Sequence, residues 1–217
     1  MLKSLLALAL VPLLVTAAIA QTEAPAPVAT PIGPALKAET VRVALQTSMG
    51  PIILELEKDR APITTANFLR YVDQKRFDGA TFYRATKVGT DGLGLIQGGA
   101  RNDPKRVLKA IAHEPTTKTG LSHVEGAISM ARAAPGSANG DFFITVGAFP
   151  SMDANPAQPG DNLGFAVFGR VAEGMDVVRK ILAAPTSPTQ GEGVMKGQML
   201  APPIRILSAK RAAKPVG

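Results

Sequence analysis

The feature that most constrains the fold of this chain is a two-residue period of apolar side chains in short segments bounded by turn residues. Val41, Val43 and Leu45 lie on one face of segment 41–48, and the same two-residue period returns in 52–57 after a break at Gly50-Pro51. Two such segments across a turn predict an antiparallel hairpin. Further short apolar segments predict strands at 81–86, where the faces are expected to alternate, and at 127–131, 142–146, 165–171 and 204–207.

Only two segments have the spacing of an amphipathic helix. The first begins at Ala61-Pro62, where proline suits the first turn and a following threonine is expected to cap free N–H groups; its apolar stripe includes Phe68 and Val72. The second carries its stripe between Met175 and Leu182. Many short strands with two helices and no internal repeat predict a mainly β protein, a closed barrel capped at its ends.

The first twenty residues have the pattern of a signal peptide. Lys3 supplies a positive start, Leu5–Val15 an apolar stretch, and Ala18-Ile19-Ala20 a small-residue cleavage site before Gln21. A transmembrane anchor is the competing interpretation, but the apolar stretch is short and ends in small residues. We therefore expect cleavage, with no membrane attachment afterwards.

The chain contains no cysteine, which excludes lipid attachment at a cysteine, disulfides, thiol catalysis and zinc–thiolate sites. Export without disulfides predicts a periplasmic protein, with secretion as the second choice.

Composition divides the rest of the chain into three parts. Residues 21–40 are rich in Pro, Ala and Thr and predict a flexible linker, whereas 41–209 are long enough for one domain with a full core. Residues 210–217 are expected to form a basic tail.

The net charge of +7 falls by one when Lys3 is removed. Nucleic-acid binding through the basic residues of 101–109 is an alternative, but no aromatic residues are interleaved there, so a solvated face is favoured and no nucleic acid is expected.

Three other types of site are weighed and set aside. The glycine pattern after Gly92 fails as a dinucleotide fingerprint, because Gln97 stands where the third glycine belongs and no long helix follows. His113 and His123 form no metal-binding set, and a structural hydrogen-bonding role is favoured for them. Ser129 and His123 are not assigned as a nucleophile–base pair.

The stretch from Ser129 to Val146 joins two apolar segments by a connection rich in Ala, Gly, Ser and Pro. Such a connection is too small and too rich in glycine to build a core, so its backbone is expected to lie open. It fits either a docking site for a peptide or an ordinary hairpin with a long loop.

Four blocks of the chain resemble the motifs of the cyclophilins and occur in the order of that family. They are Gly50–Leu56 with Ala61–Phe68, Phe82–Arg84 with Ile96–Gly99, Gly126–Ile144, and Phe165–Val171. The resemblance implies a closed eight-stranded antiparallel β-barrel capped by two α-helices. It also implies an enzyme that catalyses cis–trans isomerisation of X–Pro peptide bonds in unfolded or extended polypeptides, without cofactor or metal. We expect it to assist the folding of exported proteins as a monomer.

The resemblance implies that Arg84 is the catalytic residue. It implies that Gln97 forms a hydrogen bond to the substrate backbone and helps to hold the arginine. A guanidinium fits this chemistry, since it stays charged and carries a rigid fork of donors. The substrate-binding residues it implies are Phe143 as the floor of the proline pocket, Leu95 and Met152 as walls, Phe165 at the rim, and Ala131, Arg132 and Ala133 as the backbone that pairs with the peptide. Taken alone, Arg84 also fits a surface ion pair and Phe143 a core position.

The chain departs from the family pattern at four places. Gly94 stands where the family has a phenylalanine beside the proline pocket, and Ser151 replaces the tryptophan associated with cyclosporin binding, so weak or absent binding of that inhibitor is expected. The loop 153–164 is longer than in compact members. Asp141 replaces a glutamine, which puts a carboxylate near the substrate where it could position or neutralise Arg84. A non-catalytic peptide-binding chaperone is the alternative function.

Overall fold

The computed structural model describes residues 38–101 and 103–213, so the predicted signal peptide and nearly all of the predicted linker lie outside the described residues. Within the described part, no helix is long and apolar enough to cross a membrane. The strands are β1 (Thr40–Thr47), β2 (Gly50–Glu57), β3 (Thr81–Val88), β4 (Leu93–Gly99), β5 (Ala127–Met130), β6 (Asp141–Val146), β7 (Ala166–Glu173), β8 (Thr186–Ser187) and β9 (Met199–Ala212). The helices are α1 (Pro62–Asp73), α2 (Thr116–Thr119) and α3 (Met175–Ala183), with 3₁₀ turns η1 (Pro150–Met152) and η2 (Gly193–Met195).

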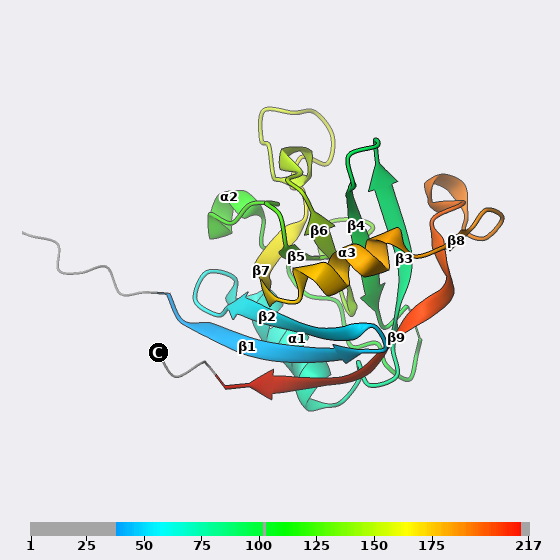
Figure 1. The fold of residues 1–217 in the computed structure, drawn as a ribbon. Coiled ribbons are helices and arrows are strands. Elements are labelled where there is room, and N and C mark those ends of the chain that lie inside the picture. The colour runs from blue at the N-terminus through cyan, green and yellow to red at the C-terminus, as the bar shows by residue number, and fades with distance from the viewer. Residues whose placement is uncertain (1–37, 102, 214–217) are drawn as a thin grey trace, which may run out of the picture. The chain divides into compact units, whose positions relative to one another are not determined.

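Eight antiparallel strands close into a barrel, as predicted. Their order around the ring is β1-β2-β7-β5-β6-β4-β3-β9, and β9 pairs back with β1. The two-residue strand β8 pairs with β9 outside this ring. The predicted hairpin is β1 and β2, joined in register from Thr40 opposite Glu57 to Thr47 opposite Gly50. Figure 1 shows the barrel with α3 lying across one side of it and α1 on another.

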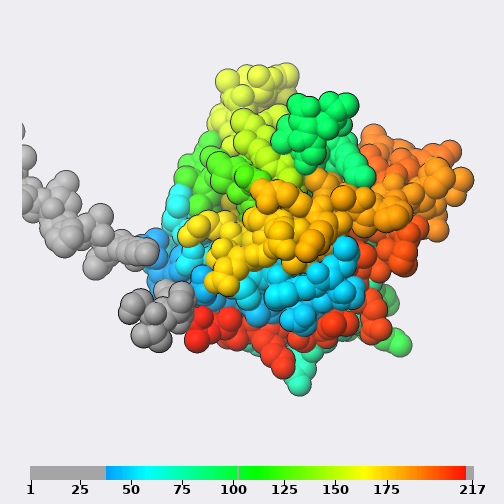
Figure 2. Space-filling model, viewed as in Figure 1, coloured from blue at the N-terminus to red at the C-terminus, as the bar shows by residue number. Residues whose placement is uncertain are grey.

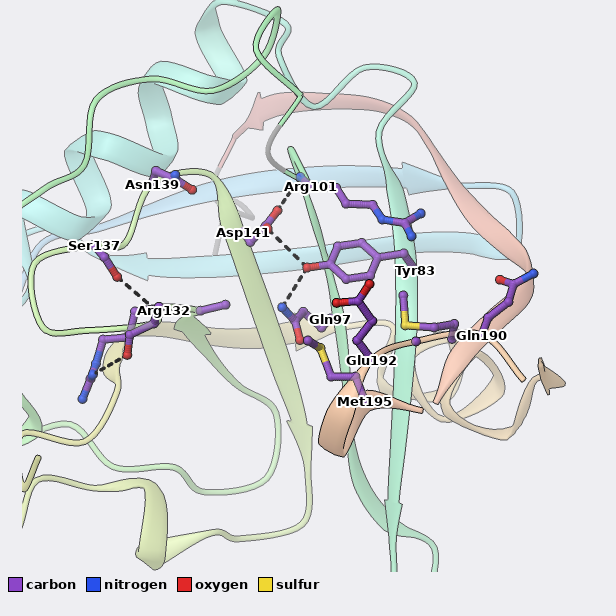
Figure 3. A pocket seen from close by; sticks show the side chains of 14 residues that line it. Tyr83, Gln97, Arg101, Arg132, Ser137, Asn139, Asp141, Gln190, Glu192 and Met195 are labelled. Atoms are coloured by element: carbon purple, nitrogen blue, oxygen red, sulfur yellow. Dashed lines mark hydrogen bonds between the residues drawn. The ribbon is translucent and has the colours of Figure 1, made fainter. Parts of the chain in front are cut away.

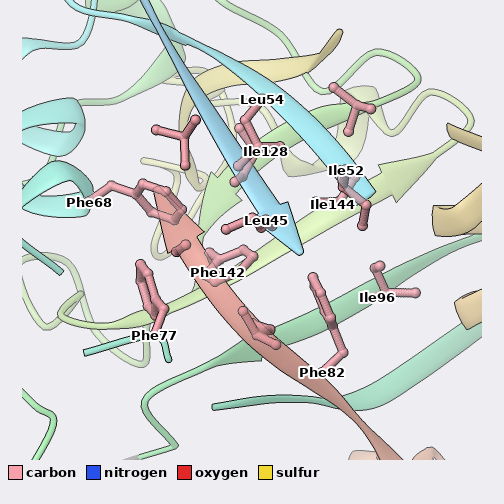
Figure 4. Packing of buried hydrophobic residues seen from close by; sticks show 14 of the residues in the cluster. Leu45, Ile52, Leu54, Phe68, Phe77, Phe82, Ile96, Ile128, Phe142 and Ile144 are labelled. Atoms are coloured by element: carbon pink, nitrogen blue, oxygen red, sulfur yellow. The ribbon is translucent and has the colours of Figure 1, made fainter. Parts of the chain in front are cut away.

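The barrel interior is filled by the apolar residues that alternate along the strands. Leu45, Ile52 and Ile128 are fully buried, and a group of aromatic rings fills one part of the interior (Figure 4). Phe68 of α1 belongs to that group, with ring centroids 5.3 Å from Phe142 and 5.2 Å from Phe168. The two-residue period therefore fixed which side chains enter the core.

The first helix is capped differently from the prediction. No threonine side chain caps α1; instead the Glu114 carboxylate accepts hydrogen bonds from the backbone N–H of Ile63 at 3.3 Å and of Thr64 at 2.7 Å. Glu114 has no exposed surface and also accepts from the Thr64 hydroxyl at 2.7 Å. A carboxylate is well placed at a helix N-terminus, because it meets both unpaired N–H groups and the positive end of the helix dipole.

The C-terminal boundary of the domain lies beyond the predicted residue 209. Strand β9 continues to Ala212, and Lys210 and Arg211 pair with Ala44 and Val43 of β1. These residues were expected in a basic tail, but their backbone completes the closure of the barrel. Arg211 also forms two hydrogen bonds of 2.8 Å to the carboxylate of Asp73 in α1.

Candidate active site

Four residues predicted or considered for the site form one row across the outside of the barrel. Arg84 of β3 lies opposite Gln97 of β4, Gln97 opposite Phe143 of β6, and Phe143 opposite Ser129 of β5. Because side chains on directly opposed residues point to the same face of a sheet, the pairing brings these groups together although they are far apart in sequence.

A β-bulge in β3 places two neighbouring side chains on this outer face. The register with β4 shifts between Phe82 and Arg84, while Phe82 and Ala85 are both buried in the interior. Tyr83 and Arg84 therefore both point outward, where strict alternation would have turned one of them inward. The sequence pattern predicted alternating faces along this strand, which is wrong at the bulge.

The guanidinium of Arg84 is held by two neutral acceptors. Its Nη1 donates to Gln97 Oε1 at 2.9 Å, and its Nε donates to Gln198 Oε1 at 2.8 Å. Among the described residues it forms no ion pair with a carboxylate, so the alternative of a surface ion pair is not what the structure has. Burial lowers the pKa of Arg84, yet a guanidinium remains charged in proteins, so its full positive charge is retained beside the row.

Asp141 does not contact Arg84 directly; a chain of hydrogen bonds through Tyr83 and Gln97 separates them, and Figure 3 shows its part from Asp141 through Tyr83 to Gln97. Asp141 accepts from the Tyr83 hydroxyl at 3.2 Å and from the backbone N–H of Arg101 at 2.7 Å. Tyr83 in turn accepts from Gln97 Nε2 at 2.7 Å. The bond from Gln97 Nε2 to Tyr83 orients the Gln97 amide with its oxygen toward Arg84. Burial raises the pKa of Asp141, although both of its hydrogen bonds act in the opposite direction.

Phe143 rests on a buried histidine. The His123 ring lies parallel to it, with centroids 5.8 Å apart and planes inclined by 8°. His123 Nδ1 is 2.6 Å from Asp153 Oδ1, and its Nε2 is 3.0 Å from Ser129 Oγ. Burial lowers the pKa of His123, so the ring is neutral at neutral pH. In the tautomer that satisfies both partners, Nδ1–H donates to Asp153 and Nε2 accepts from the Ser129 hydroxyl.

This Ser–His–Asp arrangement has the order of partners found in hydrolases, but its geometry serves packing. Ser129 has no exposed surface, so its hydroxyl cannot reach a substrate. The structural role favoured for His123 therefore fits its place beneath Phe143.

Phe165, one of the predicted apolar pocket residues, packs directly against Phe143. Phe165 meets it edge to face, with centroids 5.4 Å apart and planes at 90°, and the Phe165 N–H bonds the Met152 carbonyl at 3.0 Å. Leu95 lies on the outer face of β4, two residues before Gln97. The side chain of Arg132 turns away from the row, stacks on Phe165 at 5.2 Å and donates to Gly164 O at 2.8 Å. It thus ties the long loop 153–164 to the site.

The backbone of 131–133 is partly used within the protein. The Ala131 N–H donates to Asp141 O at 2.9 Å, and the Ala133 N–H donates to Ser137 Oγ at 3.0 Å. The N–H of Arg132 has no partner among the described residues. Backbone pairing with a peptide along this segment is therefore expected to use Arg132 N–H and the neighbouring carbonyl groups.

A cavity of about 660 Å³ opens beside Gln97 and Tyr83 (Figure 3). Its walls include Ala131, Ala133 and Asp141 from the predicted peptide-binding segments. The opposite wall comes from the segment that follows β8, through Gln190, Gly191, Glu192 and Met195. Within the described residues no group of His, Asp and Glu side chains could hold a metal ion.

Gly94 faces the interior and not the proline pocket. A Cβ at this position would lie 2.2 Å from the Thr86 carbonyl oxygen and 2.9 Å from Leu182 Cδ1 of α3. A larger residue is therefore excluded with this backbone, and the ring expected from the family has no equivalent at position 94.

Sequence reasoning missed Gln198, Tyr83 and Asp153 as partners of the site. Tyr83 adjoins Arg84, but only the bulge brings it to the outer face. Gln198 and Asp153 lie in loops whose sequence has no period, so no pattern indicated their partners.

The comparisons with known proteins agree on one family. The sequence profile described as "Cyclophilin type peptidyl-prolyl cis-trans isomerase/CLD" matches residues 42–211. A peptidyl-prolyl cis-trans isomerase of Acinetobacter baylyi is 34% identical over 77% of this chain and 84% of its own length. One from Streptomyces antibioticus is 38% identical over 77% of this chain and 96% of its own length. Peptidyl-prolyl cis-trans isomerase A of Dickeya dadantii is 35% identical over 83% of this chain and 90% of its own length.

Solved structures support the fold. A crystal structure of a Cryptosporidium parvum cyclophilin-type isomerase superposes with a TM-score of 0.61 over 82% of this chain and all of the other, at 20% identity. A structure of the same protein determined in the presence of the dipeptide Ala-Pro gives a TM-score of 0.63 over 80% of this chain and 99% of the other, at 21% identity.

Proposed function

This chain belongs to the family of cyclophilin-type peptidyl-prolyl cis-trans isomerases, and on that premise we propose that Arg84 is the group that accelerates rotation about X–Pro bonds. The observation that carries the proposal is the charged guanidinium fixed by two neutral amides, in one row with Phe143. The remaining donor group of Arg84, Nη2, has no partner among the described residues and is available to a substrate.

The chemistry needs a fixed charge rather than a nucleophile. Rotation about a peptide bond faces a barrier of roughly 18–20 kcal/mol, because conjugation gives the C–N bond partial double-bond character. At the twisted state the prolyl nitrogen regains its lone pair, and a donor aimed at it stabilises that state more than either planar form. Each ~1.4 kcal/mol of this preference increases the rate about tenfold. Phe143 would hold the proline ring, and Gln97 Oε1 would keep Arg84 in place.

The substrates we propose are proline-containing segments of unfolded or extended polypeptides. The Ala-Pro dipeptide was present with the Cryptosporidium protein, and the same kind of ligand is expected to bind along 131–133 and over Phe143 here. The signal-peptide pattern of 1–20 and the absence of cysteine support a bacterial, exported, periplasmic enzyme that acts on other exported proteins. We propose that it works as a monomer.

The test is cis-to-trans exchange of a short X–Pro peptide measured by NMR with wild-type protein and Arg84→Ala. The uncatalysed step takes tens of seconds or longer, so even a slow enzyme is detected. We expect Arg84→Ala to lower kcat/KM about a hundredfold or more, since it removes the charge at the twisted state. Arg170→Ala is the matched control, because Arg170 is an exposed strand arginine paired with Glu55.

Equal turnover by wild type and Arg84→Ala would contradict the mechanism. Binding of the peptide by wild-type protein with no acceleration would instead support the non-catalytic chaperone.

A further inference from the structure

We propose that Gln198 is a positioning residue for Arg84, an inference that rests on the proposed catalytic role of that arginine. Gln198 precedes β9 and belongs to the segment 188–198, between β8 and β9. No motif or pairing predicted a role for it.

Gln198 is itself held through its backbone and its side chain. Its carbonyl accepts from the Ala85 N–H at 2.9 Å, and its own N–H donates to the Met195 carbonyl at 3.1 Å. Its side-chain Nε2 donates to the Val194 carbonyl at 2.7 Å. Because the amide nitrogen has an acceptor at Val194, the amide is oriented with Oε1 toward β3.

The oxygen so oriented accepts two hydrogen bonds, from Arg84 Nε at 2.8 Å and from Thr86 Oγ at 2.7 Å. Arg84 and Thr86 are on the same strand, so Gln198 spans the base of the guanidinium. Gln97 binds the group at Nη1, a different nitrogen of the same plane. Two acceptors at Nε and Nη1 fix both the position and the rotation of a planar guanidinium, which one acceptor alone would not do.

The chemical type of the two acceptors matters as much as their number. Both are neutral amide oxygens, so they orient the guanidinium without cancelling its charge. A carboxylate at either place would hold Arg84 as firmly but would reduce the field at the prolyl nitrogen. The site thus combines a fixed geometry with an unneutralised cation, and Gln198 supplies half of that arrangement.

The segment 188–198 has a second relation to the site, because it also forms one wall of the cavity beside Gln97 (Figure 3). In Figure 2 this orange segment projects from the body of the domain. The turn η2 that lines the cavity through Met195 also provides the Val194 carbonyl that orients Gln198. The wall of the cavity and the support of Arg84 are therefore built from one short piece of chain.

The decisive variant is Gln198→Met, which keeps the length of the side chain and removes the acceptor. We expect kcat to fall about ten- to a hundredfold, the size expected for loss of a hydrogen bond to a charged group, while KM changes by less than about twofold. The ¹⁵N resonance of Arg84 Nε–H should shift, and its proton should exchange faster with water. Gln46→Met is the matched control, because Gln46 is an exposed strand glutamine of β1.

Gln198→Glu separates position from charge. The carboxylate loses the bond to the Val194 carbonyl but can still accept from Arg84 and Thr86, and its charge attracts the guanidinium. The Nε–H proton should therefore stay protected, while kcat falls because the positive charge is partly cancelled. A glutamate variant with wild-type kcat would overturn the requirement for a neutral acceptor.

Wild type and Arg84→Ala are measured in the same assay, so that two failures can be told apart. If Arg84→Ala is as active as wild type, the proposed catalyst fails. If Arg84→Ala is inactive and Gln198→Met keeps the kcat and the Nε–H resonance of wild type, only the positioning role of Gln198 is overturned.

Discussion

Phe142 and Phe143 are neighbours on β6 and are both buried, but they belong to two different regions of the molecule. Phe142 points into the barrel, where its ring lies 5.3 Å from Phe68 and 5.6 Å from Phe82. Phe143 points outward and lies on the His123 ring, which is held by Asp153 and Ser129. The interior is an apolar packing of rings, whereas the outer face is an apolar ring supported by polar, titratable groups.

The difference shows how one barrel separates stability from function. Interior side chains are specified by volume and apolarity, and many apolar residues could fill the same space. On the outer face, hydrogen bonds fix the direction of particular groups, as Gln97 and Gln198 do for Arg84. Changes inside should therefore alter the free energy of unfolding, and changes outside should alter the rate of isomerisation.

The largest effects are expected from alanine at the two phenylalanines. Phe142→Ala should lower the free energy of unfolding by about 3–5 kcal/mol, because it leaves a cavity in a close-packed interior. Phe143→Ala should cost less stability, since solvent can enter at the surface. It should nevertheless lower kcat/KM about ten- to a hundredfold by removing the apolar floor under the proline ring.

Denaturant unfolding and peptide exchange on the same samples measure both quantities. The separation of stability from function would be contradicted if Phe143→Ala lost as much stability as Phe142→Ala and kept the turnover of wild type.

The same contrast explains how far the sequence could predict the molecule. The closed barrel, the two longer helices and the hairpin of β1 and β2 follow from two apolar periods, and these were predicted. Arg84, Gln97 and Phe143 were found by resemblance to a family, and strand pairing places them in one row. The bulge beside Tyr83 and the amide bonds of Gln198 depend on register and loop conformation, which no period in the sequence records.

Glu114 and Asp141 illustrate the same limit. A threonine was expected to cap α1, but a carboxylate distant in sequence does so, because tertiary contacts can satisfy helix N–H groups as well as local side chains can. Asp141 was expected near Arg84, yet Tyr83 and Gln97 stand between them.

A second test uses pH, because His123, which supports Phe143 on the outer face, titrates, whereas the apolar rings of the barrel interior do not. Burial holds the pKa of His123 below its ordinary value of 6.5. In the unfolded chain the ring therefore takes up a proton first as the pH falls. The stability that depends on neutral His123 is complete above 6.5 and is lost as the pH falls from there through the lower folded pKa.

We expect Tm to decrease by a few degrees between neutral and mildly acidic buffer, measured by circular dichroism. His123→Gln should remove most of this decrease, whereas His113→Gln, which changes the other histidine of the chain, should retain it. A decrease of the same size in His123→Gln would assign the pH dependence to other groups.

The smallest effect is expected from removing one hydroxyl in the chain that links Asp141 to Arg84. Tyr83→Phe leaves Gln97 Nε2 without its acceptor, so the Gln97 amide is no longer fixed with its oxygen toward Arg84. We expect kcat to fall about three- to tenfold, as for one lost hydrogen bond of about 0.5–1.5 kcal/mol, and KM to stay nearly unchanged.

Tyr71→Phe is the matched control for this variant, because the Tyr71 hydroxyl is also hydrogen-bonded, accepting from the Leu108 N–H at 2.8 Å, but lies in α1 away from Arg84. It should lose stability and keep its kcat. Because Tyr83 acts on Arg84 only through Gln97, its effect should disappear in a Gln97→Ala background, where there is no amide left to orient. If Tyr83→Phe still lowered kcat in that background, the effect would not run through Gln97. The Tyr83 hydroxyl would then act on the substrate directly, as a polar contact in addition to that of Arg84.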